Sequence, residues 1–306
     1  MCTSIALLGK GFCFGRTLDL DREFGEGAVV TPRNYVLNFR CGEVMRRHLA
    51  FVGMATVADG YPLYADGMNE HGVCIAGLEF RGNAHYPALP SAGKRGIAPF
   101  EVIPYLLARC ESLDEARGEL EKISIVDVPF NDEVENSPLH WHIADKGGSL
   151  VVEQTADGMH AYENPFGVLA NNPPFPFHRD NYMLYLGSTS KSVRSSSPGT
   201  EVYCSGIMGR GIPGDYTSPS RFVRAAWLAE HARYDEGEEM SAAYSLLGAV
   251  APPRGAVTSE GGEEHYTRYT CVMDAKSLTY TYKTARDTEI HRTYMKKESL
   301  DSEALI

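Results

Sequence analysis

The chain lacks any apolar run that approaches the roughly 18 residues of a membrane-spanning helix, so we expect no transmembrane segment. Its first eight residues carry no basic group, unlike the start of a secretory signal, and the apolar stretch stops at Gly9. Positive charge is also scarce, because 29 Lys and Arg stand against 40 Asp and Glu among 306 residues, a formal net charge of -11. Phosphate backbones and anionic membranes repel such a chain, so neither nucleic acid nor a membrane is an expected partner.

The cysteines follow no pairing or metal-binding pattern. They number seven, which is odd, they are scattered along the chain, and no two of them form a CxxC motif. This distribution argues against a disulfide framework and against a zinc ribbon, and it fits a reduced, cytoplasmic setting. The seven are Cys2, Cys13, Cys41, Cys74, Cys110, Cys204 and Cys271.

What is present is an ordinary globular composition, with 43% apolar and 23% charged residues, so disorder is not expected as the main state. Two apolar runs at 3–8 and 12–18, separated by Gly9-Lys10-Gly11, predict a β-hairpin at the start of the chain. Further strands are predicted at 29–30, 36–39, 49–57, 73–78, 139–144, 150–153, 159–162, 168–169, 268–273 and 278–283, those from 139 to 169 as one meander.

Helices are predicted between these groups of strands. Helical spacing of apolar residues predicts one over 99–109, and a capping-box pattern at Ser112 starts a second that reaches about Ile123. Ser218 can cap a later helix that has Pro219 at its first position. The order of strands, two helices, strands, two helices and strands favours an α+β fold over a regular βαβ repeat.

Nothing in the composition divides the chain into separate units. The one biased segment is the serine-rich stretch 187–199, and the sequence on either side of it does not change in character. We interpret this stretch as a surface loop rather than a linker, and we expect one domain over residues 1–306.

Cys2 is the residue that most suggests chemistry. Because its side chain is small, an aminopeptidase is expected to remove Met1, and Cys2 then carries both a thiol and a free α-amine. The thiol becomes a strong nucleophile as a thiolate, and an α-amine that titrates near ~7.7–8.0 can take and return a proton at neutral pH. One residue thus offers a nucleophile and its base. The alternative is a small buried cysteine without a chemical role.

Arg16 and Asp19 lie just across the predicted hairpin turn from Cys2. Arg16 there would favour the thiolate by its charge, and Asp19 would accept a hydrogen bond from the α-ammonium and fix its orientation. The two residues alternate in face along a strand, so both can reach Cys2 only if the strand bends or ends between them. The alternative is a surface ion pair between Arg16 and Asp19.

Three other positions carry polar groups of interest. The amides of Asn171 and Asn172 follow a predicted strand and precede a proline, where they could donate to an oxyanion or simply form a turn. Arg221 falls in the first turn of a predicted helix, where a cation is mildly unfavourable, so it either has another use or is solvated. His140 and His142 share one face of a strand as two metal ligands would, but no third ligand is suggested, and core or hydrogen-bonded histidines fit better.

Six motifs follow one another along the chain: Met1-Cys-Thr, Phe14-Gly-Arg-Thr-Leu-Asp19, Asp66-Gly-Met-Asn-Glu-His-Gly72, Val151-Val-Glu-Gln-Thr-Ala-Asp-Gly-Met159, Asn171-x-Pro173, and Ile212-Pro-Gly-Asp with Ser218-Pro-Ser-Arg-Phe222. Together they resemble the choloylglycine hydrolase family, which includes bile salt hydrolases and penicillin V acylases. The resemblance runs from the first residue to the last and is strongest to bile salt hydrolases. Several long motifs in the right order are far more specific than any one of them.

The resemblance implies an N-terminal-nucleophile (Ntn) hydrolase with a four-layer αββα sandwich, usually a homotetramer. It implies hydrolysis of the amide bond of glycine- and taurine-conjugated bile acids, with no metal or organic cofactor. The residues that it carries over by position are Cys2 as nucleophile, Arg16 beside the thiolate, Asp19 at the α-amine, Asn171 as an oxyanion donor and Arg221 in the catalytic cluster.

Two further positions match residues that meet the substrate in this family. Leu20 matches a position that lines the apolar pocket, and the backbone N–H of the residue matching Glu79 is the second oxyanion donor. Here the sequence departs from the family, because bile salt hydrolases usually have Asn and penicillin V acylases usually have Tyr. We expect the Glu79 carboxylate to turn outward or to pair with a cation; otherwise it faces the substrate and repels an anionic leaving group. The candidate cations are Arg16, Arg81 and Arg221.

Other functions stay open beside this one. Another acylase of the same family would cleave penicillin V or an N-acyl homoserine lactone. A non-catalytic ligand-binding protein that keeps the fold would retain Met1 and leave Cys2 inert to iodoacetamide. A metalloprotein built on His140 and His142 is the third and weakest alternative.

Overall fold

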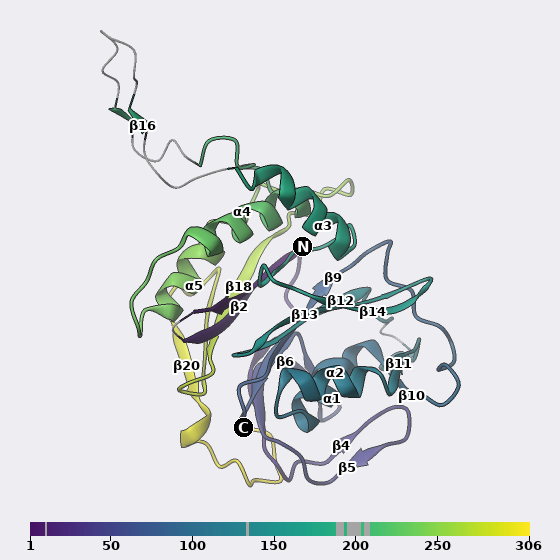
Figure 1. The fold of residues 1–306 in the computed structure, drawn as a ribbon. Coiled ribbons are helices and arrows are strands. Elements are labelled where there is room, and N and C mark those ends of the chain that lie inside the picture. The colour runs from purple at the N-terminus through teal and green to yellow at the C-terminus, as the bar shows by residue number, and fades with distance from the viewer. Residues whose placement is uncertain (10, 133–134, 188–192, 195–202, 205–208) are drawn as a thin grey trace.

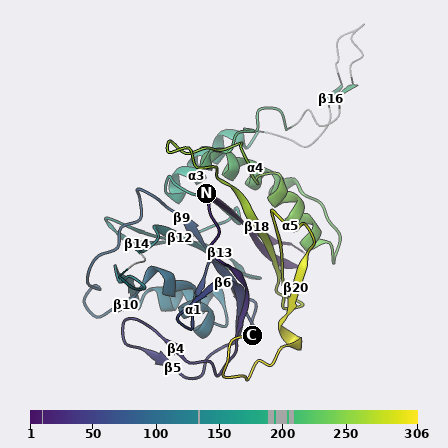
Figure 2. The same cartoon turned by 180° about the vertical axis from the view of Figure 1, so that it is seen from behind.

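Two β-sheets lie face to face in the middle of the molecule, and helices cover their outer faces (Figures 1 and 2). The structure is a computed structural model that describes residues 1–9, 11–132, 135–187, 193–194, 203–204 and 209–306. The first sheet has the strand order β15 (Val168–Leu169), β1 (Cys2–Leu8), β2 (Phe12–Leu20), β18 (Tyr266–Asp274), β19 (Thr279–Thr284) and β20 (His291–Tyr294). The second has the order β14 (Gly158–Glu163), β13 (Gly148–Thr155), β12 (Leu139–Asp145), β9 (Cys74–Glu79), β8 (Asp66–Asn69), β6 (Phe51–Ala58) and β3 (Gly27–Thr31), with β7 (Tyr61–Tyr64) paired to β6.

Each sheet carries its own pair of helices. α4 (Ser218–His231) and α5 (Glu239–Gly248) pack on the first sheet, and α1 (Val102–Arg109) and α2 (Leu113–Leu120) pack on the second. α3 (Phe175–Tyr182) packs against α4. The result is a four-layer αββα sandwich, which confirms the expected fold. The remaining elements are η1 (Pro99–Glu101), η2 (Met183–Tyr185), η4 (Met295–Lys297), β4 (Leu37–Asn38), β5 (Val44–Met45), β10 (Arg95–Ile97), β11 (Ile123–Ile125), β16 (Val193–Arg194) and β17 (Tyr203–Cys204).

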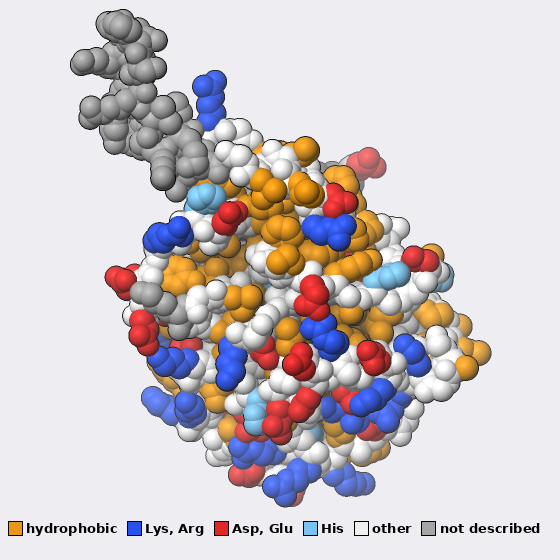
Figure 3. Space-filling model, in the orientation of Figure 1, with side chains coloured by type: hydrophobic (Ala, Val, Ile, Leu, Met, Phe, Trp, Pro, Cys, Tyr) orange, Lys and Arg blue, Asp and Glu red, His pale blue; other side chains and the backbone are white. Residues whose placement is uncertain are grey.

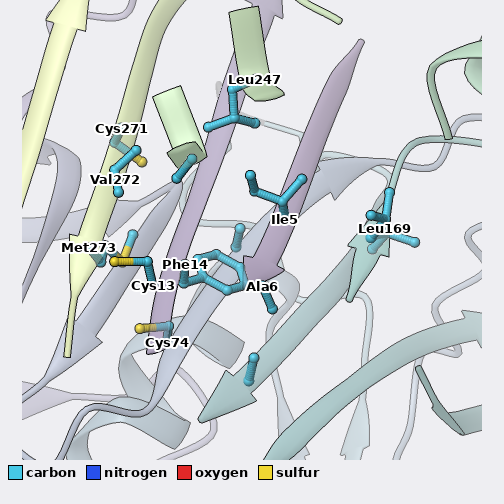
Figure 4. Close-up of a cluster of buried hydrophobic side chains, with 14 of the residues drawn as sticks. Ile5, Ala6, Cys13, Phe14, Cys74, Leu169, Leu247, Cys271, Val272 and Met273 are labelled. Atoms are coloured by element: carbon cyan, nitrogen blue, oxygen red, sulfur yellow. The ribbon is translucent and has the colours of Figure 1, made fainter. Parts of the chain in front are cut away.

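The first hairpin lies at the centre of this packing. Phe14 points toward the second sheet, where its ring lies 4.9 Å from that of His142. The outer face of β2 is covered by α5, and a Cβ on Gly15 would come within 2.9 Å of the Leu247 side chain and 2.7 Å of the Cys271 carbonyl oxygen. Figure 4 shows Leu247 above the two strands of the hairpin. The glycine in the Phe-Gly-Arg-Thr-Leu-Asp motif therefore permits close helix and strand packing.

The predicted strands are present within two residues of their expected bounds, but one of them joins the other sheet. Strand 168–169 pairs with β1 in the first sheet instead of continuing the meander of β12, β13 and β14. It leaves the second sheet so that Leu169 lies opposite Ser4. This crossing carries the chain directly to Asn171, and it sets the position of that residue relative to the amino terminus.

Helix ends differ from expectation in three places. The predicted helix over 99–109 begins as the 3-10 turn η1, and α2 ends at Leu120 because the chain enters strand β11 at Ile123. Ser112 caps α2 as expected, its hydroxyl accepting from the Glu115 N–H. Ser218 is not the N-cap of α4; Thr217 holds that place, and the Ser218 hydroxyl binds Asn171 instead.

The stretch 187–199 falls mostly outside the described residues. Among the residues that are described, no helix is both long and apolar enough to cross a membrane.

Candidate active site at the amino terminus

Cys2 is the first residue of β1, and its side chain is buried, with 2% exposed. β1 pairs antiparallel with β2, so that Cys2 lies opposite Leu18 and Ser4 lies opposite Arg16. Because side chains alternate in face along a strand, Cys2 and Arg16 point to the same side of the first sheet. That side is toward the second sheet, whose His142 Nδ1 lies 2.8 Å from Ser4 Oγ.

Arg16 is fully buried and is held from the second sheet. Its Nη1 donates to the Ala65 carbonyl oxygen at 3.1 Å and lies 3.7 Å from Asp66 Oδ2, while Nη2 is buried without a hydrogen-bond partner among the described residues. Burial works against the charged guanidinium, but the neighbouring Cys2 and Asp66 side chains raise the pKa of Arg16, so it stays cationic. The alternative interpretation, a surface ion pair between Arg16 and Asp19, is wrong, because neither side chain is exposed.

Asp19 meets the amino terminus through its backbone. Met1 N donates to the Asp19 carbonyl oxygen at 2.7 Å, and Asp19 N donates to the Met1 carbonyl oxygen at 2.9 Å. The carboxylate accepts from Thr17 Oγ1 at 3.2 Å and from Thr267 Oγ1 at 2.7 Å. Burial raises the pKa of Asp19, and the charges of Arg221 and the terminal ammonium oppose that rise.

The expectation that β2 bends or ends between Arg16 and Asp19 is wrong. β2 stays paired as far as Leu20, and the irregularity is a bulge in its neighbour β18, between Thr267 and Tyr269. Arg16 and Asp19 therefore lie on opposite faces of the first sheet. Residues of the candidate site therefore lie on both faces of the first sheet at this end of β2.

Arg221 reaches the site from the first turn of α4 and is fully buried. Its Nη1 donates to the Cys2 carbonyl oxygen and to Thr3 Oγ1, and its Nη2 donates to Asn171 Oδ1 at 2.6 Å. Burial lowers the pKa of Arg221, while Asp19 and Cys2 oppose the fall. A solvated arginine is therefore excluded, and Arg221 ties the first two residues of β1 to Asn171.

The Asn171 amide has a defined orientation. Its Oδ1 accepts from Cys2 N at 2.9 Å and from Arg221, and its Nδ2 donates to the Glu79 carbonyl oxygen at 2.8 Å. Two donors at one end and one acceptor at the other distinguish the oxygen from the nitrogen. Nδ2 carries a second hydrogen, so the same nitrogen can serve another acceptor.

Glu79 is the last residue of β9, and its N–H lies on an edge of that strand. Phe80 N donates to the Pro138 carbonyl oxygen at 2.7 Å, so the alternation of an antiparallel pair turns the Glu79 N–H away from β12. On the other edge, the pairing of β9 with β8 stops at Ala76. The Glu79 N–H therefore points past the end of β8. The Glu79 carbonyl group lies on the same edge of β9 and accepts from Asn171, which in turn binds Cys2 N near the amino terminus.

The Glu79 carboxylate is paired with cations. Its Oε1 lies 3.0 Å from Arg81 Nη2, and its Oε2 lies 3.2 Å from Met1 N. Burial alone would raise the pKa of Glu79, but the terminal ammonium and Arg81 hold it below its usual range. The pairing expected for this carboxylate is present, and Arg81 is the partner among the three candidate arginines.

Leu20 is the last residue of β2, lies opposite Tyr266 of β18, and is partly buried against the core. It follows Asp19 directly, so it lies at the end of β2 that borders the amino terminus.

The sequence alone predicts no role in this region for Ser218, His178 or Asp66. The Ser218 hydroxyl accepts from Asn171 N at 2.8 Å, and His178 Nε2 lies 2.8 Å from the Asn171 carbonyl oxygen. The Asp66 carboxylate, which lies behind Arg16, accepts hydrogen bonds from the hydroxyl groups of Tyr269 and Tyr280. Asp66 stands in one of the six motifs and Ser218 in another, so the motifs held their signal, but no sequence pattern marks His178.

The two histidines considered as metal ligands have other partners. His140 Nε2 lies 2.9 Å from the Ala170 carbonyl oxygen, and His142 Nε2 lies 2.6 Å from Ser149 Oγ. Both rings are fully buried. Within the described part of the chain, no group of three or more His, Cys, Asp or Glu is placed to hold a metal ion.

Comparison with known proteins places this arrangement in a family. The family described as "Linear amide C-N hydrolases, choloylglycine hydrolase family" matches residues 2–306. The chain is 38% identical to the "Bile salt hydrolase/transferase" of Lactiplantibacillus plantarum, over 100% of this chain and 96% of that protein. It is 33% identical to the protein of the same name from Clostridium perfringens, over 98% and 94% of the two chains.

Solved structures agree with the sequence comparisons. A conjugated bile acid hydrolase from Clostridium perfringens superposes with a TM-score of 0.93 at 32% identity, covering 100% of this chain and 96% of the other. Penicillin V acylase from Agrobacterium tumefaciens shares the fold, with a TM-score of 0.79 at 21% identity over 99% and 90% of the two chains. A family match over nearly the whole chain, together with relatives above 30% identity, shows that this chain belongs to the choloylglycine hydrolase family of linear amide C–N hydrolases.

Proposed function

We propose that this protein hydrolyses the amide bond of glycine- and taurine-conjugated bile acids, with Cys2 as the nucleophile once Met1 is removed. The observation that carries the proposal is the convergence of Arg16, Asn171 and Arg221 on the amino-terminal end of β1. The names of the relatives, bile salt hydrolase/transferase and conjugated bile acid hydrolase, support this choice of substrate.

The reaction begins at the Cys2 sulfur. Arg16, on the same face of the sheet, favours the thiolate, which attacks the amide carbonyl carbon of the substrate. The oxyanion that forms accepts hydrogen bonds from Asn171 Nδ2 and from the Glu79 backbone N–H, the two donors on the exposed edge of β9. Breakdown of this intermediate breaks the C–N bond and leaves a thioester on Cys2.

The α-amine of Cys2 moves the protons. As an ammonium it gives a proton to the departing glycine or taurine nitrogen, and as an amine it takes one from the water that attacks the thioester. The second step releases the bile acid and regenerates the thiolate, so both steps balance. With Met1 in place this nitrogen is a peptide N–H that donates to Asn171 Oδ1, and it has no proton to give. We propose that Asp19 and Asn171 hold the amine in place.

The remaining site residues would meet the substrate. Leu20 would line the apolar pocket for the steroid rings. Glu79 borders the place of the leaving group, and its pairing with Arg81 limits the repulsion of an anionic glycine or taurine end.

Another acylase activity of the same family, on penicillin V or an N-acyl homoserine lactone, is the second candidate, and the charge of the Glu79 side chain bears on the choice between these substrates. The Clostridium and Lactiplantibacillus relatives carry the bile salt name, but a protein from Pectobacterium atrosepticum named penicillin V acylase is also similar, at 25% identity over 76% of this chain. A carboxylate near the leaving group disfavours anionic leaving groups, and glycine, taurine and the penicillin nucleus are all anionic, so the Glu79 charge favours an N-acyl homoserine lactone, whose leaving group has no acidic group. A panel of glycocholate, taurocholate, penicillin V and an N-acyl homoserine lactone separates the candidates.

The proposal is tested by intact mass and by a matched pair of variants. We expect the purified protein to lack Met1 and to hydrolyse glycocholate or taurocholate. Cys2→Ala should abolish this activity, while Cys41→Ala, which removes an exposed free cysteine, should leave it unchanged. Retention of more than about a tenth of the activity in Cys2→Ala would reject the nucleophile, since truncation of such a group costs orders of magnitude. A protein that keeps Met1 and leaves Cys2 unreactive toward iodoacetamide would support the non-catalytic alternative.

We also infer one domain over residues 1–306, a homotetramer and a cytoplasmic location. β1 and β2 share a sheet with β18, β19 and β20, which supports a single unit that includes both ends of the chain. Apolar side chains gather over the end of the molecule that carries α3 (Figure 3), where Phe177, Met183, Leu184 and Leu186 are exposed, and burial of these groups would favour assembly. The exposed thiol of Cys41 suits a reducing compartment. Light scattering and cell fractionation test the last two inferences.

A further inference from the structure

A buried imidazole and a buried carboxylate lie behind the segment that carries Asn171. His140 of β12 and Glu153 of β13 are both fully buried, with His140 Nδ1 3.1 Å from Glu153 Oε1. The proposed chemistry gives neither of them a part. Burial of two ionisable groups is unfavourable unless each has partners, so their contacts indicate what the pair does.

The pair holds the Asn171 segment at both ends. His140 Nε2 donates to the carbonyl oxygen of Ala170, directly before Asn171, at 2.9 Å. Phe175 N, at the start of α3, donates to Glu153 Oε1 at 2.9 Å. The backbone on either side of the amide donor is therefore fixed to one ion pair in the second sheet.

The same imidazole supports the other half of the site. The ring of Phe80 stacks on His140, with 4.3 Å between ring centroids and 8° between ring planes. Phe80 follows Glu79 directly, so its position sets the direction of the Glu79 N–H. One side chain thus contacts the segments that present both proposed donors, the Asn171 amide and the Glu79 N–H.

Hydrogen-bond chemistry determines the protons that this pair must hold. The Ala170 carbonyl group only accepts, and Glu153 Oε1 already accepts from the Phe175 N–H. His140 Nε2 therefore carries a hydrogen that points at Ala170, and one proton lies between His140 Nδ1 and Glu153 Oε1. A ring bound at both nitrogens can neither turn over nor exchange its tautomer without breaking one of these bonds.

We propose that His140 and Glu153 are positioning residues that fix the two donors of the oxyanion hole relative to each other. The inference rests on the proposed function, because it assigns the pair a role in that reaction. Donors of this kind act only when they lie at hydrogen-bond distance from the place where the charge forms, and shifts of about 1 Å reduce catalysis severely. The pair acts on the transition state and leaves the Cys2 sulfur and its neighbour Arg16 untouched.

The test uses Glu153→Gln and a double variant, His140→Phe with Glu153→Gln. Glutamine keeps the shape of Glu153, and its Oε1 can still accept from Phe175 and His140, but it removes the charge that strengthens both hydrogen bonds. The double variant keeps the ring stack with Phe80, removes both imidazole hydrogen bonds and avoids an unpaired buried charge. The matched control is His142→Gln, because His142 lies on the same strand and face, is equally buried, and binds Ser4 and Ser149 instead.

Two reactions of the same sulfur separate positioning from general damage. Hydrolysis of glycocholate passes through an oxyanion, whereas alkylation of Cys2 by iodoacetamide needs only the thiolate and makes no oxyanion. The alkylation rate is followed by mass spectrometry of the amino-terminal peptide, because the exposed Cys41 also reacts. Circular dichroism sets a temperature at which every variant is folded.

We expect both test variants to lower kcat by roughly 10- to 100-fold, less than or equal to the loss of one oxyanion donor, with KM and the alkylation rate changed by less than about threefold. His142→Gln should lower the melting temperature without this split. The proposal is overturned if kcat and alkylation fall in parallel, if kcat does not change, or if His142→Gln gives the same split. The proposed function is judged separately, because it depends on wild-type hydrolysis and its loss in Cys2→Ala, whatever the pair does.

Discussion

Two sets of buried polar groups lie on the first hairpin and its neighbours, and they differ in charge. At the amino-terminal end, Arg16 and Arg221 are cations with no exposed surface, gathered around the start of β1. Deeper in the sandwich, burial raises the pKa of Cys13, Cys74 and Cys271 far enough to keep all three as neutral thiols. Figure 4 shows these three sulfur atoms among apolar side chains.

The contrast between Cys2 and Cys13 shows what makes one buried cysteine a candidate nucleophile and the other structural. Cys271 lies opposite Arg16 across β18 and β2, but burial and the Asp66 carboxylate still raise its pKa. Burial alone favours the neutral form of a thiol, and Cys13 is also near the carboxylates of Asp274 and Glu239, which oppose a thiolate further. Cys2 is as buried as Cys13 but has Arg16 on its own face of the sheet. The two ends of one hairpin thus give the same side chain different surroundings.

The largest expected effect comes from replacing sulfur by oxygen at both ends of the hairpin. Cys2→Ser should lower kcat by roughly 10³-fold or more, because a hydroxyl is far harder to ionise than a thiol. Cys13→Ser should leave kcat within about twofold and lower the free energy of unfolding by about 1–3 kcal/mol, the usual penalty for a buried hydroxyl. Steady-state kinetics and urea unfolding measure the two changes. Equal losses of activity in the two variants would remove the contrast between the two ends of the hairpin.

A smaller effect is expected when the cation on the Cys2 face is removed. Arg16→Gln should lower kcat by roughly 10²-fold and shift the pH profile of Cys2 alkylation to higher pH, because the thiolate loses a neighbouring positive charge. The rate of iodoacetamide labelling between about pH 5 and 9 measures the shift.

Two variants test whether this shift comes from charge on that face. Arg286→Gln removes the same charge from an exposed position and should leave the profile in place. Asp19→Asn changes the opposite face of β2 and should reduce turnover more than alkylation. An unchanged profile in Arg16→Gln would mean that the arginine serves structure or substrate binding only.

Two buried neutral histidines, His142 and His178, lead to a prediction about how stability depends on pH. Burial lowers the pKa of His142 to about 3 and that of His178 to about 4, so the folded protein keeps both rings neutral. Above about pH 6.5 the folded and unfolded states are both neutral, and below it only the unfolded state gains protons. The free energy of unfolding should therefore fall as the pH drops from 6.5 toward 4, by up to a few kcal/mol at about 1.4 kcal/mol per pKa unit.

Urea unfolding at pH 7, 6 and 5 measures this slope. His142→Gln should be less stable at pH 7, because it loses the bonds to Ser4 and Ser149, but its stability should change less with pH. An equal slope in the variant and the wild type would show that His142 is not a source of the acid sensitivity.

The sequence predicts the fold well where the pattern is local. The alternation and turn residues of the first hairpin, the cap at Ser112 and the late hairpin of β18 and β19 all depend on neighbours in the chain. The sequence pattern predicts the wrong sheet for strand 168–169, because two residues carry no information about which strand they pair with. Ser218 was assigned to the helix end for the same reason, since its true partner, Asn171, lies 47 residues away.

The candidate site shows the same division. Cys2 and Arg16 could be placed together from hairpin register alone. The burial of Arg221 could not be predicted, because a helix position says nothing about which strand end the side chain reaches. The role of Asp66 behind Arg16 depends on tyrosines some 200 residues later in the chain, a separation of 203 for Tyr269. Long-range contacts of this kind arise from packing of the two sheets, which no local pattern encodes.

The smallest expected effect concerns Glu79, at the border between the charged end and the substrate. The Met1 ammonium and Arg81 together lower the pKa of Glu79, and Arg81 remains as a partner when Met1 is removed. Glu79→Asn should therefore change kcat/KM on glycocholate and taurocholate by less than about tenfold, or 1.4 kcal/mol of barrier, and by a constant factor from about pH 5 to 8. Arg81→Gln, which leaves Glu79 without its arginine, should slow the anionic substrates more than Glu79→Asn does.

Assays of both variants on glycocholate, taurocholate, penicillin V and an N-acyl homoserine lactone, the one substrate whose leaving group has no acidic group, give the decisive ratios. A backbone N–H does not depend on the side chain that follows it, so the oxyanion donor survives in Glu79→Asn and only the charge at the leaving group changes. A gain of tenfold or more on conjugated bile acids would show that the wild-type carboxylate still repels them, which would contradict the pairing with Arg81 and reopen the choice of substrate. A ratio that varies with pH would show instead that Glu79 titrates within the assay range, against its pairing with Arg81. A small, flat ratio would show that the ion pair with Arg81 is enough to neutralise the Glu79 carboxylate.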